Sequence, residues 1–321
     1  MNLRIFAVLL ALSVVSVGIA ASCMIWRAAE IGELVGPLEE RGYPRLTVVT
    51  VGTGGGYENP ERGGPCTAVG WGHRVFLVDA GRGVAEGLRL SKIPVSQPGT
   101  VLLTNLMPAN TQGLDDLIFT GWLAPRERPL RVIGPTGSRS FVEGLLAAYR
   151  GGSDALGDSL GLPSEGARVE ILEIEGGWSE VQDNLTISAG ALPGGPLPAL
   201  AYRFEGLHRS VVVAGTGWAP DALVEFAQDA DILVHEAVYI PLPEEIESAG
   251  VIADPERLRL EAALHTSLLD VGELASRAHV RTLLLVRMRP PPFFDLQIES
   301  IVDDHFNGRI LLPEDGDEIS P

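Results

Sequence analysis

The chain has 321 residues, of which 45% are hydrophobic, and a net charge of −18. This size and composition exclude a disordered chain and are typical of a packed globular protein of one large domain or two small ones. A surface this acidic repels phosphate backbones, so we expect no nucleic acid among the partners.

An uncharged segment lies at the amino terminus, over residues 5–26. In a helix it spans roughly 30 Å, about one bilayer core. Arg4 precedes it and Glu30 follows it, which predicts an inner-membrane, single-pass anchor (residues 1–26) with the rest of the chain periplasmic or extracellular. A cleaved signal peptide giving a secreted protein, and a lipid anchor on Cys23, are the alternatives. A linker is expected over residues 27–44.

The first half of the domain is expected to begin with strands and then to alternate strands with helices. Cys66 is the one cysteine outside the amino-terminal segment, so no internal disulfide is possible, and we expect it to be a small buried residue at a strand start. Strands are predicted at 45–53, in a hairpin over 66–81, and at 100–104 and 130–134. Helices are predicted at 83–90, 115–123 and 136–149.

The second half repeats this order after a Gly/Ser-rich stretch at 151–166. Strands are predicted at 168–174, 184–189, 199–205, 210–214, 231–235, 282–286 and 309–312. Helices are predicted at 220–229, 267–278 and 294–305. Hairpins followed by strand–helix alternation in both halves predict one α/β domain, residues 45–313, with two packed sheets and helices on both outer faces. The acidic residues 314–321 are expected to fray as a tail.

Seven segments, in this order, resemble the metallo-β-lactamase superfamily, most closely its branch of ribonuclease Z-like and arylsulfatase-like hydrolases. They are VGTGGGYENPERGGPCT with Arg62, FLVDAGRGV with Asp79 and Gly81, LLTNLMPANTQGL, GPTGSRSFVEGLLAAY, VVVAGTG, DILVHEA and LHTS. The resemblance covers residues 46–312 and implies a four-layer αββα sandwich. It supports the fold more strongly than the activity, because activity depends on the site.

The resemblance also implies a pair of metal ions held by five histidines and two aspartates. The matching positions here are Asn105, Met107, Ala109, Asn110, Gly194, Thr216 and Arg287. Zinc requires imidazole, thiolate or carboxylate donors, three or four to each ion. With all seven replaced, we expect the two-metal zinc site to be absent and the protein to take no cofactor.

Three charged residues and a histidine stand out around the replaced positions. Arg287 and Arg62 are candidate anion-binding residues, although a buried arginine can also replace the charge of a metal as a structural prop. Glu236 and His265 match polar residues of the family and are the residual catalytic candidates, through general acid–base chemistry. The alternative for both is a structural role at the end of a strand or helix.

The sequence therefore predicts a membrane-anchored, periplasm-facing protein that has lost metal-dependent hydrolysis and serves in binding or as a scaffold. Its partner would be a small anionic ligand or an envelope protein, the latter docking on residues 240–262. The alternative is a hydrolase of sulfate, phosphate or carboxylic esters that acts without metal through His265, Glu236 and Arg287.

Overall fold

The computed structural model describes residues 3–56, 59–124, 126–215, 218–238, 260, 264–289, 295–303 and 305–321. The chain divides into two units, Met1–Glu39 and Glu40–Pro321. The first contains one helix, α1 (Leu3–Val35), which continues into the segment expected to be a linker. Its Leu12–Ala29 part has a mean hydropathy of 1.6 and is long and apolar enough to cross a membrane.

The second unit begins with a sheet that holds the strands predicted for the first half, together with Val169–Glu173, predicted for the second half, and Glu318–Ile319, predicted as part of a tail. Its strands are β1 (Tyr43–Gly52), β2 (Cys66–Gly72), β3 (Arg74–Val78), β4 (Thr100–Leu102), β5 (Leu130–Gly134), β6 (Val169–Glu173) and β14 (Glu318–Ile319). Their order across the sheet is β14-β1-β2-β3-β4-β5-β6. Strands β3 to β6 are parallel, whereas β1 pairs antiparallel with β2 and β14.

The second sheet repeats this plan. Its strands are β7 (Ser179–Gln182), β8 (Leu185–Ala191), β9 (Leu200–Gly206), β10 (Arg209–Ala214), β11 (Ile232–Val238), β12 (Thr282–Arg289) and β13 (Arg309–Leu311). They are ordered β13-β12-β11-β10-β9-β8-β7. Strands β10 to β13 are parallel, and β7 to β10 form an antiparallel meander.

Helices cover the outer face of each sheet, and the two sheets pack on each other. The helices of the domain are α2 (Val84–Leu90), α3 (Pro108–Thr111), α4 (Leu114–Leu123), α5 (Ser138–Leu160), α6 (Pro220–Phe226), α9 (Leu268–Arg277) and α10 (Asp295–Asp303), with a 3-10 turn at Ser164–Ala167. One apolar core joins α2, α4 and α5 to the first sheet, a second lies between the sheets, and a third joins α6, α9 and α10 to the second sheet.

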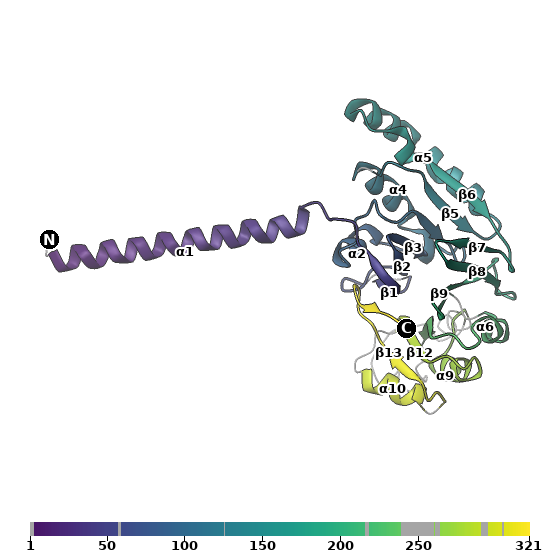
Figure 1. The fold of residues 1–321 in the computed structure, drawn as a ribbon. Helices are drawn as coiled ribbons and strands as arrows, with labels where there is room; N and C mark the ends of the chain where they lie inside the picture. The colour runs from purple at the N-terminus through teal and green to yellow at the C-terminus, as the bar shows by residue number, and fades with distance from the viewer. Residues whose placement is uncertain are drawn as a thin grey trace. The chain divides into compact units, whose positions relative to one another are not determined.

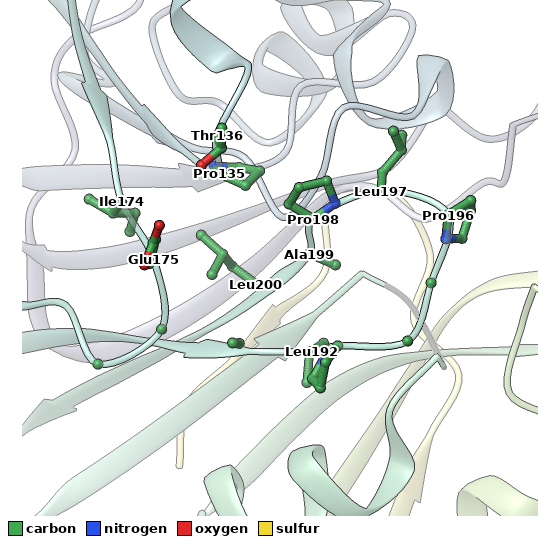
Figure 2. Close-up of a pocket in the computed structure, with 16 residues that line it drawn as sticks. Pro135, Thr136, Ile174, Glu175, Leu192, Pro196, Leu197, Pro198, Ala199 and Leu200 are labelled. Carbon is green, nitrogen blue, oxygen red and sulfur yellow. The ribbon is translucent and has the colours of Figure 1, made fainter.

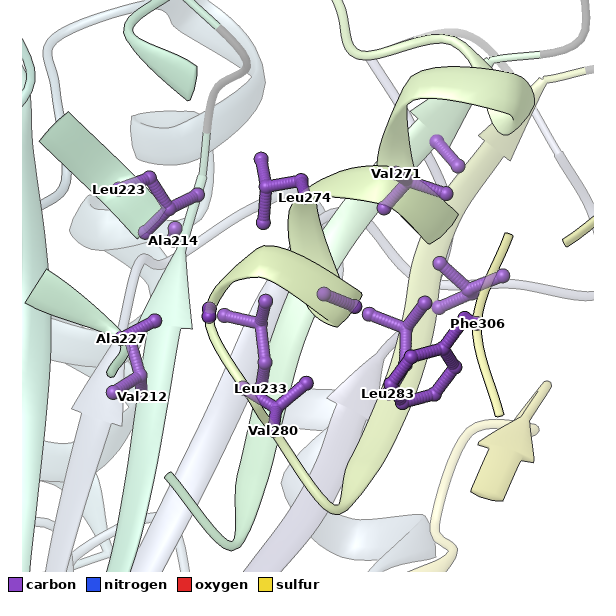
Figure 3. Packing of buried hydrophobic residues seen from close by; sticks show 14 of the residues in the cluster. Val212, Ala214, Leu223, Ala227, Leu233, Val271, Leu274, Val280, Leu283 and Phe306 are labelled. Atoms are coloured by element: carbon purple, nitrogen blue, oxygen red, sulfur yellow. The ribbon is translucent and has the colours of Figure 1, made fainter. Parts of the chain in front are cut away.

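The third core illustrates how the apolar faces of the helices meet the sheet. Leu223 of α6 and Leu274 of α9 pack over Leu233 and Leu283 of the central parallel strands (Figure 3). The ribbon shows α9 and α10 beside β12 and β13 (Figure 1). The expected αββα sandwich is confirmed.

Two segments differ from expectation because tertiary contacts override local sequence. Helix α5 continues through the Gly/Ser-rich stretch to Leu160, where Trp122 lies within 3.2 Å of the position a Cβ on Gly157 would take. The carboxyl-terminal residues do not fray: Glu318 and Ile319 pair with β1. Residues 314–321 are therefore part of the domain and not a separate tail.

Gly113 fixes the approach of α4 to the loop after β3, and its replacement by alanine is expected to destabilise the domain. A Cβ there would lie 2.1 Å from the carbonyl oxygen of Gly81, so the backbone must shift, at a cost of about 1–3 kcal/mol. Gly144 on α5 is the matched control, since its Cβ would meet nothing within 4 Å. Gly144→Ala should stabilise by about 0.5–1 kcal/mol through helix propensity. Urea unfolding of both variants measures the difference, and equal effects would contradict the steric argument.

Candidate functional site

The candidate site lies where the parallel strands of both sheets end. Asp79 follows β3, Thr104 follows β4 and Gly215 follows β10, while His235 and Glu236 lie in β11 and Arg287 in β12. Carboxyl ends of parallel strands gather side chains from distant parts of the chain at one edge. The strand order therefore brings these residues together.

Asp79 is the buried acidic centre of the site. Its carboxylate accepts the Thr104 N–H at 2.8 Å and the Thr104 hydroxyl at 2.8 and 3.0 Å. Burial raises the pKa of the Asp79 carboxyl above its ordinary value, and the Arg287 charge and the Thr104 hydrogen bonds oppose that rise. A carboxylate at this depth needs a counter-charge to stay ionised.

Arg287 supplies that counter-charge from the second sheet. Its Nη2 donates to Asp79 Oδ2 at 2.5 Å, and its Nη1 donates to Asn110 Oδ1 and to the Gly215 carbonyl, both at 2.9 Å. The side chain is 10% exposed. Both terminal nitrogens therefore have internal partners, and the guanidinium joins the loop after β3 and helix α3 of the first half of the domain to β12 of the second.

Two asparagines complete this polar network. The Asn110 amide nitrogen donates to Thr104 Oγ1 at 3.0 Å and to Asn105 Oδ1 at 2.8 Å, and Asn105 Oδ1 also accepts the Met107 N–H at 2.9 Å. Both asparagines are buried. The two side chains are therefore buried and bonded to each other.

Glu236 and His265 form a second polar pair at the end of β11. His265 Nδ1 lies 2.8 Å from Glu236 Oε2; the histidine side chain is 39% exposed and the glutamate only 3%. A buried carboxylate beside one ring nitrogen orients a histidine and fixes its tautomer. His235 differs, since it is fully buried with Nε2 2.9 Å from Thr266 Oγ1, and burial lowers its pKa. His265 is therefore the member of this group that meets solvent.

Cys66 is buried at the start of β2, as expected. Burial, and next the negative charge of Asp79, raise the pKa of its thiol. A protonated, inaccessible thiol is not a nucleophile.

Gly194 lies on a cavity beside this network and not within it. The cavity measures about 740 Å³ and is lined by residues 135–136, 174–177 and 191–200. Figure 2 shows Thr136 and Glu175 facing a wall of prolines and leucines. Trp218 packs so closely on Gly195 that a Cβ would fall 1.8 Å from its ring, and its Nε1 donates to the Leu264 carbonyl. The cavity wall thus continues toward the segment that carries His265.

The structure brings together some of the seven replaced positions and not others. Arg287 bonds to both Asp79 and Asn110, and Asn110 bonds in turn to Asn105. Met107 is half-buried, and Ala109 lies 3.1 Å from the position of a Cβ on Gly56, so it faces the glycine-rich loop that joins β1 to β2. Thr216 lies outside the described residues, as do nearly all of residues 240–262.

The two candidate anion-binding arginines are held by internal partners instead. Arg287 is paired with Asp79, and Arg62 Nη1 donates to Thr53 Oγ1 at 2.7 Å and to the Pro313 carbonyl at 2.9 Å. An anion would have to compete with these contacts. The structure favours the alternative role for Arg287, a cationic prop at the base of the site.

The described donors do not fit a pair of zinc ions. Over the described ranges, no group of three or more His, Cys, Asp or Glu side chains is placed to hold a metal. Asp79 is already bound by Arg287, whose permanent positive charge disfavours a neighbouring cation.

Asp79 is the residue whose role the sequence reasoning missed. It belongs to the FLVDAGRGV segment, and its partner Arg287 lies 208 positions further along the chain. A signal was available: a lone carboxylate after a buried strand requires a cation nearby, and Arg287 follows an equally apolar strand.

Comparison with known proteins gives no match to a family profile but clear relatives. Ribonuclease Z of Mycobacterium bovis is 30% identical over 281 residues, covering 84% of this chain and 96% of the relative. Ribonuclease Z of Mycobacterium sp. is 32% identical over 254 residues, covering 77% and 85%.

Solved structures agree on the fold. The metallo-β-lactamase fold protein YhfI of Bacillus subtilis has a TM-score of 0.66 at 17% identity, covering 86% of this chain and 99% of its own. The short form of human tRNase Z has a TM-score of 0.63 at 18% identity, covering 85% and 98%. Zn²⁺-bound PqqB of Methylobacterium extorquens has a TM-score of 0.61 at 15% identity, covering 86% and 100%.

These comparisons correct two expectations. The expectation of no cofactor is wrong, since the relatives are ribonuclease Z and a structural neighbour is Zn²⁺-bound; replaced ligand positions alone do not exclude a metal. The exclusion of nucleic acid is also wrong, because the relatives are ribonucleases. A net charge of −18 averages over the whole surface and does not describe one face. The chain belongs to the metallo-β-lactamase superfamily, in its ribonuclease Z-like branch.

Proposed function

We propose that this protein is a binding or scaffold member of the ribonuclease Z-like branch that does not carry out the hydrolysis of its relatives. The observation that carries the proposal is the buried ion pair between Arg287 and Asp79, with Asn110 bonded to the same guanidinium. Hydrolysis in such a site needs an activated water and space for the scissile bond. Here Arg287, Asp79 and Asn110 are instead bonded to one another.

The test is a cleavage assay on the purified full chain. A precursor tRNA, a phosphodiester, a sulfate ester and a carboxylic ester are offered with and without added zinc or manganese, beside the Mycobacterium bovis ribonuclease Z as a positive control. We expect no turnover above the blank. Metal-dependent cleavage that disappears in Asp79→Asn would refute the proposal. Retention of the tRNA without cleavage would identify RNA as the ligand.

A second candidate function is ester hydrolysis through His265 and Glu236. It is favoured by the 2.8 Å contact that orients a solvent-exposed imidazole beside a buried carboxylate. A histidine oriented in this way acts as a general base, typically for a gain of about 10²–10⁴-fold.

Replacement of His265 separates the two candidates. If His265 is the base, His265→Ala should lower any ester hydrolysis seen in EDTA by about 10²-fold or more. The control is His279→Ala, because the His279 side chain is 71% exposed and precedes the start of β12, whereas Arg287 lies near the end of that strand. Equal rates in the two variants would rule out this mechanism.

The location proposed for the protein is the inner membrane, with the domain in the periplasm or outside the cell. Support comes from α1, whose Leu12–Ala29 part is uncovered by protein and apolar enough to span a bilayer. A small anionic ligand or an envelope protein remain candidate partners on this view, together with RNA. The cavity beside Gly194 is the place offered to a small ligand.

A further inference from the structure

The carboxyl-terminal segment is built into the candidate site. Asp315 Oδ1 accepts the Thr53 N–H at 2.8 Å and the Thr53 hydroxyl at 2.6 Å, and Asp315 Oδ2 accepts the Gly63 N–H at 2.6 Å. One carboxylate therefore bridges both ends of the glycine-rich loop after β1. Hydrogen bonds to a carboxylate are shorter and stronger than neutral ones.

Neighbouring contacts hold Asp315 in place. The Thr50 hydroxyl donates to the Glu314 carbonyl at 2.6 Å, and the Gly316 N–H donates to the Thr50 carbonyl at 2.7 Å. Arg41 Nη2 lies 2.6 Å from Glu318 Oε1, and Glu318 belongs to β14, which pairs with β1. The segment is anchored on both sides of the carboxylate.

Thr53 connects this segment to the second sheet through a hydrogen bond with Arg287 of β12. Its carbonyl accepts the Arg287 N–H at 2.7 Å. Arg287 has a φ of 58°, in the left-handed region that costs a residue other than glycine about 1 kcal/mol or more. The surrounding contacts must therefore hold the Arg287 backbone, and Thr53 supplies one of them. The same residue then directs its guanidinium to Asp79.

We propose that residues 313–319 act as a latch, in which Asp315 is a positioning residue that fixes the glycine-rich loop and, through Thr53, the backbone of Arg287. The latch goes beyond the proposed function, because it would hold Arg287 whether or not the site turns over a substrate. It predicts that a substitution of Asp315 alters the stability of the backbone at Arg287.

Asp315→Asn is the sharpest test, since it keeps the shape of the side chain. Both carboxylate oxygens accept N–H groups, so the amide must turn its own NH₂ toward a donor. Glu314→Gln is the matched control: it removes one negative charge from the adjacent position, where the side chain is exposed. Hydrogen exchange of the full chain is followed at Thr53, Gly63 and Arg287, with Leu233 in β11 reporting global unfolding.

We expect the amides of Thr53, Gly63 and Arg287 to exchange about tenfold faster or more in Asp315→Asn than in Glu314→Gln, as the loss of a charge-assisted hydrogen bond allows. The Leu233 amide should change equally little in both. Faster exchange at Thr53 and Gly63 with Arg287 unchanged would overturn the coupling. A uniform increase that includes Leu233 would also overturn it, because the effect would then be global.

Discussion

Replacing Arg287 by methionine is expected to destabilise the domain by about 3–5 kcal/mol, because it leaves the buried Asp79 carboxylate without its counter-charge. The Thr104 hydrogen bonds remain, but they do not neutralise the charge. Methionine is unbranched and fills part of the space of the arginine, so the loss reports on the ion pair and on the bonds of Arg287 to Asn110 and Gly215 rather than on a cavity. Denaturant unfolding measures the loss in free energy of unfolding, provided that the dependence of this free energy on denaturant concentration is the same in both proteins.

A double-mutant cycle assigns the effect to the pair. Asp79→Asn keeps an oxygen for the Thr104 N–H, so Asp79→Asn/Arg287→Met should be more stable than Arg287→Met alone, with an interaction energy of about 2–3 kcal/mol. The control is Arg281→Met, the same substitution at the start of β12. Arg281 is 70% exposed, and its partner Asp231 keeps a contact with Arg209, so the loss should stay below about 1 kcal/mol.

The deficit of Arg287→Met should depend on pH. Burial already raises the pKa of Asp79, and removing Arg287 removes the charge that opposes the rise. The folded variant then holds a proton at a pH where the unfolded chain, with an ordinary pKa of about 3.9, has lost it. Its stability relative to the native chain is therefore lowest at neutral pH and recovers as the pH falls through the raised pKa of Asp79. A deficit independent of pH between 7 and 4 would show that the carboxylate is not the cause.

The sequence was sufficient for the layers of this fold because each apolar run is bounded by turn residues, and hairpins precede strand–helix units in both halves. The sequence was insufficient where packing against distant residues determines the extent of a helix or the presence of a strand. Helix α5 crosses Gly151 and Gly152, poor helix residues, because Trp122 of α4 packs on Gly157 further along. Strand β14 is two residues long and acidic, and it exists through its pairing with β1.

The sequence located the residues of the candidate site but did not predict which of them contact one another. The resemblance located Asn105, Asn110 and Arg287, and all three meet in the structure. The partner of Arg287, Asp79, left no local pattern in the sequence, because the two residues are 208 positions apart. The latch through Asp315 was missed for the same reason, because a short acidic stretch near the chain end resembles a solvated tail.

Removal of residues 1–39 is expected to release the protein from membranes completely. Side chains such as Val17 and Ile25 on α1 are about 70% exposed, and water cannot accommodate so long an apolar helix. The full chain should stay in the pellet after carbonate extraction, whereas residues 40–321, a compact unit by themselves, should be soluble and folded. A full chain that is monomeric and soluble without detergent would contradict the anchor.

Point substitutions and intact mass separate the forms of anchoring. Arginines at Val17 and Ile19, near the middle of the span, cost about 2.5–3.5 kcal/mol each in a bilayer and should release an uncleaved anchor; Leu207→Arg, at an exposed turn of the domain, is the control. An intact mass equal to that of a chain starting near residue 23 would indicate cleavage. An additional acyl mass that is absent from Cys23→Ser would indicate a lipid anchor.

The orientation of the domain is tested by labelling Asp158→Cys with an impermeant maleimide in intact cells. Labelling should succeed if the domain faces outward, because Asp158 is exposed on α5. Labelling only after lysis would place the domain inside.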